Sequence, residues 1–244
     1  TIKGNSLTLV TTNAGDAVTL TPVLVFTNKT IGAGKTVVLA PSSSLAGADS
    51  GNYTLSLSGA PTATADITAK QLTVGGSFTA NNKEYDGNTN ATINANSLTL
   101  VTTTAGDAVT LTPVLVFTNK TIGTGKTVVL APSSSLAGAD SGNYTLSLVG
   151  APTATADITA KQLTVGGSFT ANNKEYDGNT NATINGNSLT LVTTNVGDAV
   201  TLTPVLVFTN KTIGTGKMVV LAPSSSLAGA DSGNYTLSLA GAPT

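Results

Sequence analysis

The residues of this chain that could carry chemistry are few: eleven lysines, ten aspartates and two glutamates, with no histidine and no cysteine. Without histidine there is no Ser-His-Asp triad, no imidazole metal ligand and no usual general base. The absence of cysteine excludes disulfides and thiolate metal sites. Glu84 and Glu175 are the only glutamates, and a paired-carboxylate glycosidase site would need an aspartate partner that the sequence does not place. We therefore predict no catalytic, cofactor-binding or metal-ligating residue, and we expect that the protein is not an enzyme.

Asp86 lies in the most distinctive segment, NNKEYDGNTNATI, which occupies residues 81–93 and recurs unchanged at 172–184. One interpretation makes Asp86 a ligand for Ca²⁺ or for a receptor, but no second carboxylate follows at the spacing of a calcium-binding loop. The other makes Asp86 and Gly87 a turn, in which the carboxylate accepts backbone N–H groups, the glycine takes a positive φ and Tyr85 packs its ring against the fold. The sequence favours the turn.

Three further features of the sequence could take part in chemistry or modification. GAGK at 32–35 and GTGK at 123–126 faintly resemble a phosphate-binding loop but lack the spacing GxxxxGK[ST], so we predict hairpin turns between strands. Each repeat also holds lysine, asparagine and an acid, which leaves open a Lys–Asn isopeptide bond formed with loss of one ammonia. The tripeptides NKT, NYT and NAT match glycosylation sequons, which matter only where asparagine is glycosylated.

The positions of these motifs follow one period, because 184 − 93 = 91 residues separate the two copies of the segment. NSLTLVTT likewise begins at Asn5, Asn96 and Asn187, and 244 − 2 × 91 leaves a third copy of 62 residues. A period this long exceeds that of most solenoids and indicates beads with separate small cores. We predict a partial first repeat at 1–72 that lacks N-terminal strands, a complete second repeat at 73–163, and a partial third repeat at 164–244 that lacks its last strand. Both ends would then expose unpaired strand edges.

The elements that position these residues are predicted to be strands. NYTLSL, residues 52–57, alternates apolar and polar side chains, which is typical of a strand with one wet face. In DAVTLTPVLVF, residues 16–26, Pro22 marks an edge, a bulge or a strand that changes sheet. TATADITAKQLTV, residues 62–74, has neither glycine nor proline and favours one extended segment that joins two repeats. The expected fold is all-β, with tandem Ig-like β-sandwich repeats of about seven strands arranged as an elongated, stiff rod.

The predicted core of one period is mostly aliphatic, with two phenylalanines and two tyrosines. Burial of about a dozen such side chains is enough for a unit of this size to fold alone. The predicted core residues are Val18, Leu20, Val25, Phe26, Val38, Tyr53, Leu55, Leu57, Ile67, Leu72, Phe78 and Tyr85.

Charge restricts the partners. The net charge is −1 and charged residues make up 9% of the chain, so neither nucleic acid nor an anionic membrane is an electrostatic partner. No apolar run approaches the roughly 18 residues of a membrane span, so no membrane insertion is expected in this segment. The expected partners are neighbouring repeats and, in a filament, other copies of the chain that supply missing strands.

Four motifs in fixed order carry a resemblance: NNKEYDGNTNATI, FTNKTIGTGKTVVLA, LAGADSGNYTLSL and ATADITAKQLTV. Over the full period the chain resembles the YDG-type repeat domains of large bacterial surface and secreted proteins, filamentous-haemagglutinin-like adhesins among them. The resemblance implies a passive stalk or spacer outside the bacterial cell and no catalytic residues. The alternative is a multivalent module whose repeats each bind a glycan or a protein. Against it, exposed aromatic anchors are scarce.

Overall fold

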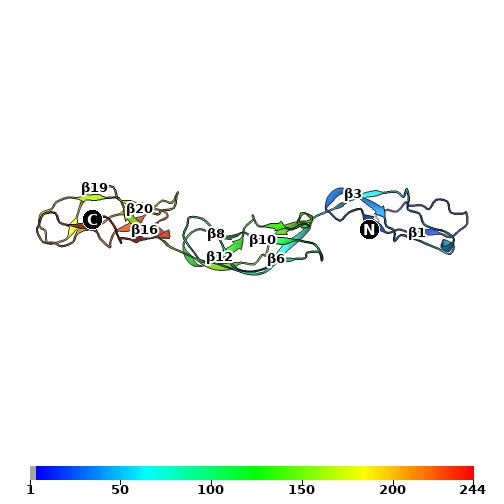
Figure 1. Ribbon diagram of the computed structural model, residues 1–244, viewed down its shortest axis with the longest axis horizontal. Coiled ribbons are helices and arrows are strands. Elements are labelled where there is room, and N and C mark those ends of the chain that lie inside the picture. Colours follow the sequence, from blue (N-terminus) through cyan, green and yellow to red (C-terminus); the bar gives the residue numbers. More distant parts are fainter. Residues whose placement is uncertain (1–3) are drawn as a thin grey trace. The chain divides into compact units, whose positions relative to one another are not determined.

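The computed structural model describes residues 4–244, which form β-strands joined by turns (Figure 1). Within this range there is no α-helix, and the only helical elements are the 3-10 turns η1 Ser50–Asn52, η2 Ser141–Asn143 and η3 Ser232–Asn234. No helix in the described range is long and apolar enough to cross a membrane. The predicted all-β class is confirmed, and the repeats are sandwich-like units with several small sheets.

Most strands recur at intervals of 91 residues, although β6 is continuous where its counterpart is divided into β16 and β17. The first repeat contains β1 Thr19–Thr21, β2 Leu24–Phe26, β3 Gly32–Leu39, β4 Ser44–Ala46 and β5 Ala63–Ile67. The next ten strands are β6 Lys70–Ala80, β7 Lys83–Glu84, β8 Asn90–Ala91, β9 Ile93–Val101, β10 Thr110–Thr112, β11 Leu115–Phe117, β12 Gly123–Leu130, β13 Ser135–Ala137, β14 Tyr144–Ser147 and β15 Ala154–Thr159. The last ten are β16 Lys161–Gly166, β17 Phe169–Ala171, β18 Asn181–Ala182, β19 Ile184–Asn187, β20 Thr190–Val192, β21 Thr201–Thr203, β22 Leu206–Phe208, β23 Val219–Leu221, β24 Ser226–Ala228 and β25 Tyr235–Ser238.

The chain divides into two compact units. The first comprises the residues up to 72 together with 102–110 and 136–147, and the second comprises 73–101, 111–135 and 148–244. In the first unit β3 pairs with both β2 and β5. In the second, one five-stranded sheet has the order β7-β15-β12-β11-β8, and β16 lies between β20 and β25. Parts of the second repeat thus pack with the first repeat, and the third repeat packs with the rest of the second.

Pro22 separates two strands that belong to different sheets. β1 ends at Thr21 and pairs with β4, whereas β2 begins at Leu24 and pairs with β3. Because proline has no N–H to donate to a ladder, the run breaks there and continues in the other sheet. This confirms one of the roles predicted for Pro22.

Of the predicted core residues, Leu72, Phe78 and Tyr85 are buried, whereas Val25 and Val38 lie on the face opposite the core. These residues are directly opposite each other in the β2–β3 ladder, so their side chains share one face. The buried face carries the neighbouring pairs instead: in the second repeat Leu115 is opposite Leu130, and Phe117 is opposite Val128, and all four are buried. Successive side chains of a strand point to opposite faces. An error of one residue in choosing the inward-facing positions therefore exchanges the buried and the exposed residues.

Phe26 was also predicted to be buried, but its exposed fraction is 38%, against 2% for its counterpart Phe117. β11 pairs with β8 on one side and β12 on the other, while β2 pairs only with β3 among the described residues. The greater exposure of Phe26 follows from this single pairing of β2 in the described chain.

Candidate functional site: the contact between consecutive repeats

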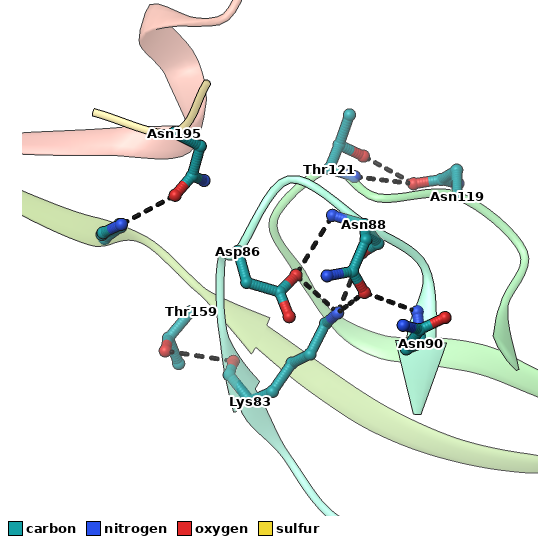
Figure 2. Close-up of polar contacts among 9 residues, drawn as sticks. Lys83, Asp86, Asn88, Asn90, Asn119, Thr121, Thr159 and Asn195 are labelled. Atoms are coloured by element: carbon teal, nitrogen blue, oxygen red, sulfur yellow. Dashed lines mark hydrogen bonds and ion pairs between the residues drawn. The ribbon is translucent and has the colours of Figure 1, made fainter. Parts of the chain in front are cut away.

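The Tyr85-Asp86-Gly87 segment forms a polar turn closed by Lys83 (Figure 2). Lys83 Nζ lies 2.7 Å from Asp86 Oδ1 and donates to the Asn88 carbonyl at 2.8 Å. Asp86 Oδ1 also accepts the Asn88 N–H at 3.1 Å, and Gly87 has a φ of 83°. The predicted turn is therefore present: the Asp86 carboxylate accepts a backbone N–H, and Gly87 lies in the left-handed region.

The electrostatics of Asp86 fit a structural role. Burial alone would raise the pKa of its carboxyl, but Lys83 and the Asn88 N–H outweigh burial and hold that pKa below its ordinary value. Within residues 4–244 no three potential metal-ligating side chains gather in one place. Glu84 and Glu175 both lie exposed.

Strand β15 holds this turn in place. It pairs in parallel with β7, so that Ile158 is opposite Lys83 and Thr159 is opposite Glu84. The Tyr85 N–H donates to the Thr159 carbonyl at 2.9 Å, and the Thr159 hydroxyl donates to the Lys83 carbonyl at 3.3 Å (Figure 2). Because β15 continues after one residue into β16 of the third repeat, the turn lies at the boundary between two repeats.

Tyr85 forms the apolar centre of this boundary. Its ring packs edge-to-face on Tyr235 of the third repeat, with 5.3 Å between centroids and 82° between planes. Such pairs add about 0.5–1.5 kcal/mol beyond area burial. Tyr85 and Tyr235 share one buried cluster with Leu163 and Ile158. The core is therefore continuous from the second repeat into the third.

Lys120 links the same two repeats by charge. Its Nζ lies 3.1 Å from Asp198 Oδ1 and 4.0 Å from Asp231 Oδ1, and 5.9 Å from the centroid of the Tyr85 ring. The Asp198 side chain is almost fully buried, whereas that of Lys120 is partly exposed. A buried carboxylate needs such a partner, because an unpaired buried charge is strongly destabilising.

The pKa values around Lys120 follow from these contacts. Hydrogen bonding to Asp198 raises the pKa of Lys120 well above its ordinary value. Burial would raise the pKa of Asp198, but hydrogen bonds from Tyr235 and Lys120 lower it overall. Burial and the bond to Asp198 raise the pKa of Tyr235 to about 12. Burial, with Asp198 nearby, also raises the pKa of Tyr85. Its buried hydroxyl has no hydrogen-bond partner in the described part of the chain.

The boundary between the first and second repeats uses the same contacts. Lys29, the counterpart of Lys120, lies 2.8 Å from Asp107 and 3.3 Å from Asp140. The Ile31 N–H donates to Asn143 Oδ1 at 3.1 Å, just as the Ile122 N–H donates to Asn234 Oδ1 at 3.1 Å. We call this set, a lysine and an isoleucine N–H on one repeat with two aspartates and an asparagine on the next, the joint network.

The joint network was not identified from the sequence. Its partners are 78 and 112 residues apart along the chain, so no local motif contains them. Tyr235 and its hydroxyl bond to Asp198, 2.6 Å long, were likewise missed. The only sequence signal was that every residue of the joint network is repeated exactly. Most other residues of the period are repeated too, so repetition alone does not single out the network.

The GAGK and GTGK motifs were predicted as turns between strands, and this placement is wrong. Both lie inside strands β3 and β12, at a register shift in the pairing with β5 and β15. The Gly34 N–H donates to Asp66 Oδ1 at 2.8 Å. The Asp66 carboxylate therefore occupies the N–H group that a bound phosphate would need. Lys126 Nζ donates to Asn119 Oδ1 at 2.5 Å, and Lys35 and Lys217 make the equivalent contacts to Asn28 and Asn210. A bulge rather than a phosphate loop explains the motif.

Comparison with known proteins now identifies the family. The model of the YDG domain matches residues 1–64, 68–155 and 159–244. The chain belongs to the YDG domain family. No match was found among curated proteins or among solved structures. The YDG tripeptide is thus the polar turn whose tyrosine, in the second repeat, packs against the next YDG domain.

Proposed function

We propose that these YDG domains are spacer repeats of a long extracellular bacterial adhesin or surface filament, and that they carry no catalysis. Their role is to hold another part of the protein at a set distance from the cell. The resemblance in the sequence to surface-protein repeats supports this proposal, and so does the absence of cysteine, which avoids oxidative cross-linking during export.

The observation that carries the proposal is the identity of the joint network at both repeat boundaries. Lys29 and Lys120 each engage two aspartates of the next repeat, and the isoleucine N–H bonds agree at 3.1 Å. If every boundary between repeats has the same contacts, every boundary has the same geometry. The length of the array then grows in proportion to the number of repeats. The shared extended segment also limits rotation between repeats, unlike a Gly/Ser linker. Regular, stiff joints are what a spacer requires.

Small-angle X-ray scattering of the chain in solution tests this role. With a rise of roughly 35–45 Å per 91-residue repeat, estimated from strands of about ten residues at 3.3 Å each plus turns, the 244 residues should have a maximum dimension of roughly 95–120 Å. A rod whose cross-section is that of one domain should fit the whole scattering curve. A compact particle, or a curve that requires a broad ensemble of bent shapes, would contradict the stiff spacer.

A glycan and protein array distinguishes the spacer from a multivalent binding module. We expect no binding at submicromolar concentration, because Trp and Arg, two of the three side chains that usually anchor ligands, are absent from the sequence. Submicromolar binding that rises with the number of repeats would instead favour the binding module.

A further inference from the structure

Two parallel ladders each join an early strand of a repeat to a late one. In the second repeat β7, which follows β6 after two residues, pairs in parallel with β15, so that Thr159 is opposite Glu84. In the third repeat β16 pairs in parallel with β25 along residues 161–164. The segment by which the chain enters the second repeat is therefore bonded directly to the strand by which it leaves.

Side chains strengthen the ladder between β7 and β15. The Asp157 N–H donates to Asn82 Oδ1 at 2.7 Å. The Thr159 hydroxyl donates to the Lys83 carbonyl at 3.3 Å (Figure 2). The Tyr85 N–H donates to the Thr159 carbonyl at 2.9 Å. The two strands are therefore tied together at several successive residues.

The exit strand β15 leads directly into the next repeat. Only Ala160 separates β15 from β16. Ile158 before it is 2% exposed and Leu163 after it is 0% exposed, so the backbone is anchored in the core on both sides. Tension along the chain therefore passes from the β7–β15 ladder into the β16–β25 ladder within a few residues.

Parallel pairing decides how such a ladder responds to tension. When the chain is pulled at its ends, the entry strand is drawn towards the N-terminus and the exit strand towards the C-terminus, so two parallel strands slide along each other. The hydrogen bonds of a ladder run between the strands, and sliding loads all of them at once. A hairpin pulled at its open end instead loses its hydrogen bonds one pair at a time. The parallel ladder therefore withstands more force for the same number of hydrogen bonds.

We propose that the β7–β15 and β16–β25 ladders are mechanical clamps and that these repeats carry tension along the chain. This function goes beyond that of the proposed spacer, which has only to set a distance. The two clamps lie in series along the backbone, so each bears the full force. Because forced unfolding is governed by the unfolding rate, the resistance depends on the direction in which the ladder is loaded as well as on stability.

Single-molecule force spectroscopy of the full chain tests the proposal by comparing two directions of pulling. The sequence has no cysteine, so handles can be fixed to cysteines introduced at chosen positions. Handles at the two termini load the parallel ladders, whereas handles on Val114→Cys and Ser133→Cys peel the antiparallel β11–β12 hairpin from its open end. At the same loading rate we expect a higher unfolding force with the terminal handles. The main event should release one 91-residue repeat, a contour length of roughly 300–330 Å at 3.3–3.6 Å per residue.

A clamp variant shows whether the β7–β15 ladder bears the force. Asn82→Ala with Thr159→Val removes two side-chain hydrogen bonds of the clamp at exposed positions. With terminal handles we expect the second repeat to unfold roughly tenfold faster at a fixed force, the effect of losing one to two net hydrogen bonds. With the hairpin handles the rate should be unchanged. Asn173→Ala with Thr68→Val is the matched control, because these counterparts lie 91 residues away, where the described chain has no ladder equivalent to β7–β15.

Three results would overturn the clamp. The first is an equal unfolding force in the two directions, and the second is a clamp variant that unfolds at the rate of its control under terminal load. The third is a clamp variant that unfolds faster by the same factor in both directions, because its hydrogen bonds would then stabilise the fold without bearing the load. None of these results alters the shape expected in solution scattering, so failure of the clamp is distinguishable from failure of the spacer.

Discussion

Tyr85 is 1% exposed and packs on Tyr235, whereas Tyr176, which lies in an identical stretch of sequence, is 64% exposed. The difference arises from the segments that pack on each tyrosine. Tyr85 is held by β15 and covered by the third repeat, while no equivalent strand pairs beside Tyr176 in the described chain. The same thirteen residues therefore occupy two environments, which provides a matched pair for experiments.

Tyr85→Ala should destabilise the second and third repeats by about 3–5 kcal/mol, the range for loss of a buried aromatic ring. Tyr176→Ala should change the free energy of unfolding by less than about 0.5 kcal/mol, as is usual for exposed side chains. Urea unfolding followed by circular dichroism measures both. Equal effects of the two substitutions would show that Tyr85 does not stabilise the joint.

Substitution of each joint lysine by glutamine should lower the melting temperature in the order Lys120, Lys29, Lys211. Lys120 neutralises the nearly buried Asp198, and Lys29 pairs with Asp107 while remaining mostly exposed itself. Lys211 has no ion pair within residues 4–244 and is the control. Because exposed pairs are screened by salt, the effect of Lys29→Gln should shrink more at about 1 M NaCl than that of Lys120→Gln. If calorimetry gave the opposite order of melting-temperature losses, the burial assigned to the aspartate partners of Lys120 and Lys29 would be wrong.

The joint should be most stable between about pH 4 and pH 10. The pKa of Asp198 is lowered in the folded protein, so its contribution is present above the unfolded value of about 3.9 and is lost as pH falls through the folded pKa. The pKa values of Lys120 and Tyr235 are raised, the latter to about 12. Their contributions are present below the unfolded values of about 10 and are lost as pH rises through the folded values.

Melting curves across the pH range measure this window. Asp198→Asn should flatten the acidic side relative to the unmodified chain, and Tyr235→Phe should flatten the alkaline side. Asp66→Asn is a control for the acidic side, because Asp66 accepts the Gly34 N–H and takes no part in the joint network. An acidic side left unchanged by Asp198→Asn would show that this carboxyl does not control joint stability.

The intact mass of the purified chain should equal that of its sequence, with no loss of ammonia. Lys126 Nζ contacts Asn119 Oδ1 at 2.5 Å, but both side chains reach solvent. Attack on the amide carbon needs a neutral amine, which proteins usually obtain by burying the lysine, and Lys126 has no carboxylate among its hydrogen-bond partners in the described chain. A mass lower by one ammonia per repeat, abolished by Asn119→Ala together with its counterparts, would contradict this.

The repeat period, the all-β class, the break at Pro22 and the turn at Asp86–Gly87 were all predictable from the sequence. Each depends on local chemistry or on direct repetition: alternation of side chains, a missing N–H, a left-handed glycine and a 91-residue spacing. The interpretation of Asp86 as a turn was possible because its partners Lys83 and Asn88 lie within three residues.

Other features were decided only by the tertiary structure. Val25 and Val38 were assigned to the wrong face because an apolar run such as Leu24–Phe26 does not say which of its residues point inward, and only the register with Val37–Leu39 does. The placement of GAGK depended on its pairing with β5. The joint network joins Lys120 to Asp198 and Ile122 to Asn234 across 78 and 112 residues. Local sequence patterns determine which segments form strands and turns, but contacts between distant segments depend on how those strands pack, which the tertiary structure alone decides.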